Sequence, residues 1–163
     1  MAAPILSIIG KSRSGKTTLI EKLIPALKAR GYKVGTIKHH SHPGFEIDFP
    51  GKDTWRHAQA GSDHVVIVAP DKIASIRNLE QALPIDEIAD SMADMDIILT
   101  DGYKSAGKPS IEIIRAETGL ELIGDPVQIL AIATDIAIDT PIFQVNLNDL
   151  QAIIAVIESN LLR

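Results

Sequence analysis

Residues 10–17 read Gly-Lys-Ser-Arg-Ser-Gly-Lys-Thr, which has the residue types and the spacing of a phosphate-binding loop, G-x-x-x-x-G-K-[ST]. The glycines leave room for backbone N–H groups to approach phosphate oxygens without a Cβ in the way. Lys16 supplies a full positive charge, and the hydroxyl of Thr17 is a ligand that Mg²⁺ accepts. The loop therefore predicts a nucleotide site in which Lys16 is the catalytic residue, because phosphoryl transfer requires charge neutralisation.

Both flanks of this loop favour the same interpretation. Residues 5–9 form a short, mostly apolar run typical of a buried strand, and residues 17–29 have the apolar periodicity of a helix. The N-terminus of that helix adds unpaired N–H groups and the positive end of its dipole. The predicted nucleotide-binding residues are Gly10, Ser12, Arg13, Ser14, Gly15, Lys16, Thr17 and Thr18.

Two carboxylates are candidates for the magnesium site, together with Thr17. Asp101 ends an apolar strand, as a Walker-B acid does; the alternative is a simple turn with Gly102. Asp48 lies in a loop that could fold over the phosphates, and the alternative for it is a solvated loop acid.

One residue is a candidate for recognising the base of the nucleotide. Asp135 follows a predicted strand, where its carboxylate could accept the N–H groups of guanine; a plain turn acid is an equal alternative. The sequence has no strict N-K-x-D pattern, so guanine recognition depends on Asp135 alone.

Residues 39–61 have the most uneven composition in the chain, with four of the five histidines and the only tryptophan. Such a segment usually marks a site or an interface. Its first histidines are candidates either for a transition-metal site or for a loop that packs against a partner or substrate: His39, His40 and His42. Three further residues of this segment are candidates for lining an anion site: Trp55, Arg56 and His57. The alternative is that Trp55 is a core residue and Arg56 a surface residue.

The elements that must position these residues alternate between strands and helices. Strands are predicted at 5–9, 32–38, 64–69, 72–77, 96–102, 110–115, 127–133 and 142–145. Helices are predicted at 17–29, at 53–61 with Asp53 as N-cap, within 79–95 after Pro84, and after Asn148 as N-cap. Residues 64–69, with 65–68 as the core of the strand, form a hairpin with 72–77. The fold class is α/β: a P-loop NTPase with a mostly parallel twisted sheet and helices on both faces. The site residues then meet at the carboxyl edge of the sheet.

Length and composition set further limits. We expect 163 residues to form a single nucleotide-binding domain, 1–163. The net charge of −5 argues against a general affinity for nucleic acid or an anionic membrane. The sequence has no cysteine, which excludes disulfides and thiolate metal sites. No leader and no apolar run long enough to span a bilayer is evident, so we expect a cytoplasmic protein.

Several motifs together resemble one family, and they cover nearly the whole chain. They are the P-loop with Thr17-Thr18-Leu19, Lys38-His39-His40, Phe45-Glu46-Ile47-Asp48, Pro50-Gly51-Lys52-Asp53-Thr54-Trp55-Arg56-His57 and Asp101-Gly102-Tyr103-Lys104. The chain in this respect resembles MobB, the molybdopterin-guanine dinucleotide biosynthesis accessory proteins. The resemblance implies a homodimer that binds GTP and Mg²⁺, hydrolyses GTP weakly, and assists the nucleotidyltransferase MobA. Molybdopterin and molybdoenzyme chaperones are further candidate partners. In this family Gly15, Lys16 and Thr17 would hold phosphate and Mg²⁺, with Asp48 and Asp101 in the metal region.

Slow hydrolysis also follows from the residues after Asp101. Gly102, Tyr103 and Lys104 include no glutamine or acid to orient a water. Three alternatives compete. A small-molecule kinase would need an arginine-bearing lid, yet only Arg115 and Arg163 follow Asp101; a partitioning-type ATPase would use Lys11 but lacks the neighbouring glycines. A urease- or hydrogenase-type metal-delivery GTPase would normally carry cysteine ligands.

Overall fold

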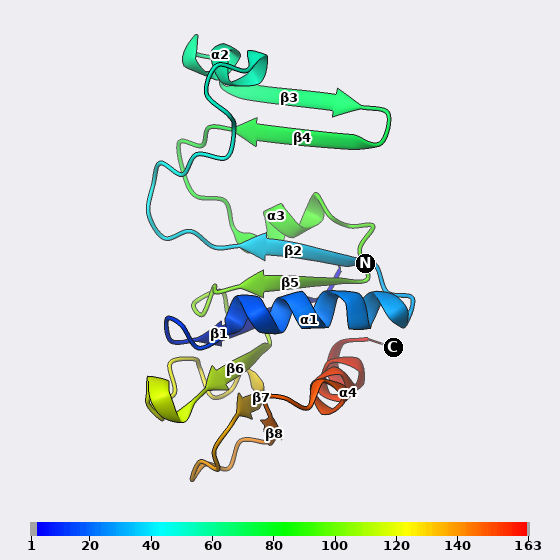
Figure 1. The fold of residues 1–163 in the computed structure, drawn as a ribbon, viewed down its shortest axis with the longest axis vertical. Helices are drawn as coiled ribbons and strands as arrows, with labels where there is room; N and C mark the ends of the chain where they lie inside the picture. Colours follow the sequence, from blue (N-terminus) through cyan, green and yellow to red (C-terminus); the bar gives the residue numbers. More distant parts are fainter. Residues whose placement is uncertain (1–2, 163) are drawn as a thin grey trace. The chain divides into compact units, whose positions relative to one another are not determined.

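The strand that precedes the phosphate-binding loop lies inside a six-stranded sheet of order β2-β5-β1-β6-β7-β8 (Figure 1). All five neighbouring pairs in this sheet are parallel. The strands are β1 (Ile5–Gly10), β2 (Val34–Lys38), β5 (Ile97–Asp101), β6 (Ser110–Ile114), β7 (Ile129–Thr134) and β8 (Gln144–Asn146). This arrangement confirms the predicted α/β class and the mostly parallel sheet.

The structure is a computed structural model that describes residues 3–162; residues 1, 2 and 163, including Arg163, lie outside the described part. The chain divides into unit 1, residues 1–39 and 85–163, and unit 2, residues 40–84. A division by packing does not establish which parts fold alone, so the single domain 1–163 stays a prediction. No helix within residues 3–162 is long and apolar enough to cross a membrane.

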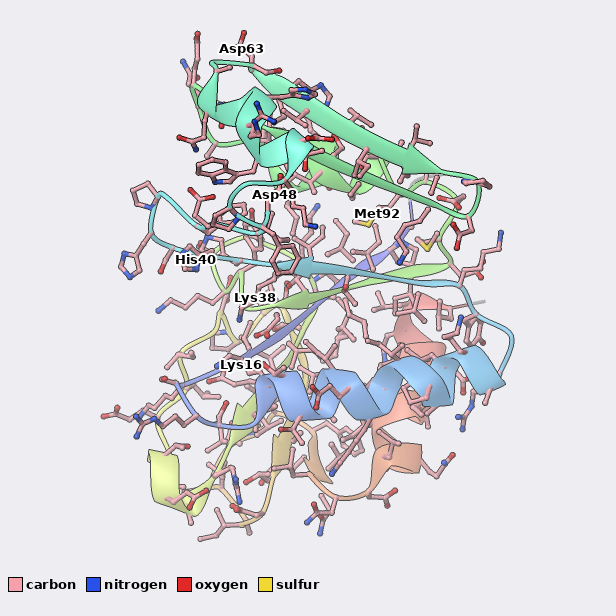
Figure 2. All side chains as sticks on the ribbon, turned by 45° about the horizontal axis from the view of Figure 1, so that its top comes forward. Lys16, Lys38, His40, Asp48, Asp63 and Met92 are labelled. Atoms are coloured by element: carbon pink, nitrogen blue, oxygen red, sulfur yellow. The ribbon has the colours of Figure 1, made fainter. Side chains whose placement is uncertain are left out.

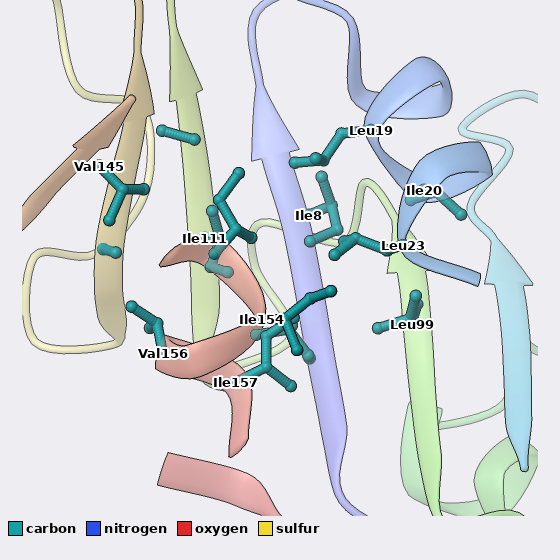
Figure 3. Packing of buried hydrophobic residues seen from close by; sticks show 14 of the residues in the cluster. Ile8, Leu19, Ile20, Leu23, Leu99, Ile111, Val145, Ile154, Val156 and Ile157 are labelled. Atoms are coloured by element: carbon teal, nitrogen blue, oxygen red, sulfur yellow. The ribbon is translucent and has the colours of Figure 1, made fainter. Parts of the chain in front are cut away.

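One face of the unit 1 sheet is covered by α1 (Lys16–Ala29) and α4 (Leu150–Leu161) (Figure 3). Side chains of both helices and of alternate strand positions form one buried cluster, which includes Leu6, Ile8, Leu19, Leu23, Ile97, Leu99, Ile111, Ile154 and Ile157. Fully burying one such leucine or isoleucine contributes about 1.5–3 kcal/mol. This core holds the start of α1 against the end of β1, where the loop lies.

The opposite face of the same sheet packs on α3 (Ile85–Asp90). Ile5, Ile37 and Ile98 of the strands contact Ile85 and Ala89 of that helix. The strands therefore alternate, with Ile97 and Leu99 toward α1 and Ile98 toward α3. Helices on both faces were predicted and are confirmed. The helix predicted within 79–95 is shorter than its periodicity suggested, because it begins only after Pro84 and ends at Asp90.

Unit 2 contains α2 (Asp53–Gln59) and an antiparallel hairpin of β3 (His64–Ala69) and β4 (Lys72–Arg77). The hairpin was predicted at these residues and is confirmed. Residues 65–68, predicted as the core of this strand, lie inside β3, and of these four residues only Val65 is buried. Val66, Ile67 and Val68 are exposed, since the hairpin forms a two-stranded sheet of its own.

Two predicted helix caps differ by one residue from those observed. The N-cap of α4 is Asp149, whose side chain accepts a hydrogen bond from the N–H of Ala152, and not Asn148. The N-cap of α2 is Lys52, which places Asp53 in the first turn. In that position its carboxylate still interacts favourably with the positive end of the helix dipole. Neither shift moves a site residue.

Candidate functional site

The loop between β1 and α1 adopts a conformation that depends on its glycines. Gly10 and Gly15 have φ values of 151° and 97°, and Arg13 between them also has a positive φ of 63°. A Cβ at Gly10 would lie 2.8 Å from the carbonyl oxygen of Ile113, too close to be accommodated without a shift. The first turn of α1 has no side-chain cap. Its N–H groups are therefore available to an anion.

Lys16 turns its ammonium group back into this loop. Its Nζ donates to the carbonyl oxygens of Gly10 at 3.0 Å and of Lys11 at 2.8 Å. Desolvation lowers the pKa of Lys16, the carboxylate of Asp101 opposes this by raising it, and Lys38 lowers it further. A phosphate at this position would favour the charged ammonium. Ser14 adds a hydroxyl that is buried and has no hydrogen-bond partner among residues 3–162.

Thr17 and Asp101 meet at the carboxyl edge of the sheet. The hydroxyl of Thr17 donates to Oδ2 of Asp101 over 2.9 Å. The ammonium of Lys38 lies 3.0 Å from the same oxygen, and Figure 2 places Lys16 and Lys38 at the end where the strand arrows of this sheet terminate. The other oxygen of Asp101, Oδ1, is buried and lacks a partner in the described part of the chain. Two residues, Thr17 from α1 and Lys38 from β2, therefore converge at the carboxylate that ends β5.

Backbone contacts hold Asp101 in place. The N–H of Gly102 donates to the carbonyl of Ile8, and the N–H of His39 donates to the carbonyl of Asp101. The rings of His39 and Tyr103 are stacked at a tilt, with centroids 4.3 Å apart. Tyr103 has a φ of 66°, an uncommon value for a residue with a side chain. The turn after β5 is thus well defined, which orients the carboxylate toward Thr17.

Asp135 follows β7 directly, as predicted. Its carboxylate accepts the N–H of Ala116 at 3.0 Å and lies 3.3 Å from Nε of Arg115. The backbone hydrogen bond from Ala116 has the largest effect and lowers the pKa of Asp135; desolvation opposes it, and the hydrogen bond and charge of Arg115 lower the pKa further. The residue is therefore ionised and anchors the segment after β6. Its role as a guanine reader stays a prediction.

The segment after β6 also contacts the phosphate-binding loop. Lys11, which had no predicted partner, forms an ion pair with Glu121 over 3.2 Å. The buried carboxylate of Glu112 in β6 accepts the N–H groups of Ile123 and Gly124 at 2.7 and 3.0 Å. Sequence reasoning did not identify Glu112. An acid inside an otherwise apolar strand was the available signal, because a buried carboxylate needs hydrogen-bond donors.

Asp48, the third predicted magnesium ligand, belongs to unit 2. Its Oδ1 accepts the N–H of Phe49 over 2.7 Å. It lines a cavity of about 620 Å³ within unit 2, together with His40, His42, Trp55 and Arg77. Arg56 is exposed and does not line this cavity, whereas Trp55 is half-buried. No group of three or more His, Asp or Glu side chains within residues 3–162 is arranged to hold a metal ion.

Lys38 is the residue that the predicted site lacked. It ends β2 in the same way that Asp101 ends β5, at the carboxyl edge of the sheet. The rule that selected Asp101 would have selected Lys38 as well. The sequence alone does not reveal that β2 and β5 are neighbours.

Comparison with known proteins gives consistent matches. Residues 5–135 match the family model for "MobB: Molybdopterin guanine dinucleotide synthesis protein B". A molybdopterin-guanine dinucleotide biosynthesis adapter protein of Haemophilus influenzae is 37% identical over 147 residues, which cover 88% of this chain and 82% of that protein. The protein of the same description from Escherichia coli is 32% identical over 157 residues, covering 92% and 89%.

Solved structures agree with these sequence matches. A crystal structure of molybdopterin-guanine biosynthesis protein B is similar with a TM-score of 0.73 at 29% identity, over 98% of this chain and 99% of the other. A crystal structure of Bacillus subtilis MobB has a TM-score of 0.69 at 24% identity, over 94% and 97%, which shows the same fold.

Proposed function

Since the chain belongs to the MobB family of molybdopterin guanine dinucleotide synthesis proteins, an assignment that agrees with the resemblance in its motifs, we propose that it is a GTP-binding adapter. It would assist the nucleotidyltransferase MobA in the cytoplasm. The observation that carries the nucleotide part is the contact of Thr17 with Asp101 beside the phosphate-binding loop, over 2.9 Å. A hydroxyl and a carboxylate that meet next to a helix N-terminus form the usual setting of a magnesium nucleotide.

In the proposed phosphate site, both backbone groups and side chains contribute to binding. Gly10 and Gly15 give the loop its shape, and Lys16 exchanges its two carbonyl partners for phosphate oxygens. The remaining contacts come from the loop and the first turn of α1: Ser12, Arg13, Ser14, Thr17 and Thr18. Ser14, with its buried and unpartnered hydroxyl, has a free donor for this purpose.

Magnesium would be held by Thr17 and Asp101. The further ligand predicted from the sequence, Asp48, belongs to unit 2 and stays a prediction. The donor set fits this ion, because Mg²⁺ prefers oxygen ligands and keeps several of its waters. The buried, unpartnered Oδ1 of Asp101 supports the fit. When bound, the ion would neutralise charge on the phosphates. Hydrolysis would be weak, because Gly102, Tyr103 and Lys104 after Asp101 offer no side chain of the kind that orients an attacking water.

Asp135 would accept the N–H donors of guanine. Its hydrogen bond from Ala116 and its contact with Arg115 favour the ionised form that such recognition needs. A carboxylate cannot accept hydrogen bonds from the corresponding acceptor edge of adenine, so Asp135 would select GTP over ATP.

A homodimer would cover the exposed apolar side chains of the unit 2 hairpin. Val66, Val68 and Ile73, which the strand register places on one face of the hairpin, are between 49% and 73% exposed. Contiguous exposed apolar side chains are typical of an interface. MobA, molybdopterin and molybdoenzyme chaperones are the other proposed partners.

Calorimetric titration with MgGTP and MgATP tests the nucleotide proposal. Wild type should bind GTP more tightly than ATP, and Asp135→Asn should reduce that preference while it retains binding. Asp139→Asn removes another exposed carboxylate of unit 1 and serves as the control. Preference for ATP would contradict the proposal. Co-purification of MobA with tagged protein from native cells tests the pathway role, and its absence at stoichiometric expression would contradict that part.

A further inference from the structure

Lys38 has no role in the site as proposed so far, yet its ammonium lies 3.0 Å from Oδ2 of Asp101. The pairing of β2 with β5 places Lys38 directly opposite Asp101. Paired residues of neighbouring parallel strands project from the same face of a sheet, which here is the face of α1. The contact therefore follows from the strand register and is more than a chance approach of two long side chains.

The two oxygens of Asp101 have different surroundings. Oδ2 accepts the hydroxyl of Thr17 and contacts the Lys38 ammonium, whereas Oδ1 is buried without a partner within residues 3–162. An unpartnered buried carboxylate oxygen is costly. The Lys38 ammonium supplies a positive charge in direct contact with this carboxylate.

Mg²⁺ and the Lys38 ammonium would bind the same carboxylate, and two cations within a few ångströms repel each other. The side chain of Lys38 is 65% exposed and that of Asp101 only 11%, so Lys38 is the member of the pair that is free to move. We propose that Lys38 is a positioning residue that holds Asp101 toward Thr17 before Mg²⁺ arrives and that Mg²⁺ displaces it from Oδ2. This inference rests on the proposed magnesium site at Thr17 and Asp101.

Removal of the Lys38 charge should therefore increase the affinity of the site for Mg²⁺. In Lys38→Met, the Mg²⁺ concentration for half-maximal GTP binding should fall by up to about fivefold, the upper end of what loss of a partly exposed competing ion pair is expected to give. Lys38→Arg retains the charge and should stay close to wild type. Lys108→Met breaks the other lysine–aspartate pair of unit 1, with Asp86, and is the matched control.

A second measurement needs no nucleotide. Millimolar MgCl₂ alone should raise the Tm of Lys38→Met by about 2 °C more than that of wild type, because an uncompensated Asp101 binds the ion in the folded state only. In an Asp101→Asn background, the Lys38→Met change should no longer alter the response of the Tm to MgCl₂. A general loss of positive charge would instead act in both backgrounds.

The outcomes are distinct. An equal Mg²⁺ response of wild type and Lys38→Met in the Tm measurement would overturn the role of Lys38, and so would an effect that persists with Asp101→Asn. A Mg²⁺ effect as expected together with no GTP binding would overturn the proposed function and leave the role of Lys38 intact.

Discussion

The two units of the chain bury their strands to very different degrees. All five residues of β5 in unit 1 are buried, whereas only Val65 among the six residues of β3 in unit 2 is. Unit 1 buries the apolar residues of its central strands and presents polar side chains at the carboxyl edge of its sheet. Unit 2 exposes apolar residues on its hairpin. The difference teaches that unit 1 places the candidate nucleotide site on a well-buried sheet, whereas the hairpin of unit 2 exposes apolar side chains of the kind found at interfaces.

The largest expected effect is on stability. Leu99→Ala in β5 removes a fully buried side chain and should lower the free energy of unfolding by about 2–5 kcal/mol. Val68→Ala on the hairpin should change it by no more than about 0.5 kcal/mol, because Val68 is already 73% exposed. Urea denaturation of both variants measures the contrast, and similar losses at the two positions would contradict it.

The second-largest expected effect is on nucleotide binding by unit 1. Lys16→Ala removes the ammonium from the loop and should weaken GTP binding by about 100-fold, since loss of one partner of a desolvated charge pair costs several kcal/mol. Calorimetry measures the affinity, and an unchanged far-UV circular dichroism spectrum excludes unfolding. The control is Lys28→Ala, near the other end of α1. Unchanged affinity in Lys16→Ala would refute the phosphate site.

Charged substitutions on the hairpin should change the association of two chains and leave the stability of each chain almost unchanged. Val68 and Ile73 are cross-strand partners and both are exposed, so Val68→Glu with Ile73→Glu should dissociate the proposed homodimer. Stability of the separated chain should change by no more than about 1 kcal/mol for the two surface changes together. Light scattering reports the mass. As a control, Val127→Glu changes an exposed apolar residue of unit 1 and should leave the measured mass unchanged. A dimer that persists in the double variant would show that the hairpin is not the dimer interface.

The smallest effect should come from the exposed carboxylate of Asp135. Its pKa is lower in the folded protein than its ordinary value of 3.8, so its contribution to stability is complete above that value. The contribution is lost as the pH falls through the lowered folded-state pKa. Asp135→Asn should therefore flatten the acid dependence of the unfolding free energy below pH 3.8, which urea denaturation at several pH values measures.

The local sequence pattern was sufficient to predict the strand and the helix that flank the phosphate-binding loop. The apolar run before Gly10 and the helical periodicity after Thr17 predicted β1 and α1, because both signals lie within a few residues of the element they form. The hairpin in unit 2 was predictable for the same reason. The exposure of Val66–Val68 was not, since a β-branched run has the same pattern on a core strand and on a free hairpin.

The amino-acid sequence by itself determined the phosphate-binding loop, the acid at the end of β5, and the family. Each depends on residue types at short, fixed spacing. The tertiary structure decided that Lys38 and Asp101 meet although 62 positions separate them, because strand order and register are set by the packing of the whole sheet. It also decided that Glu112 holds the segment beside Lys11, which depends on the burial of β6 and not on any local motif.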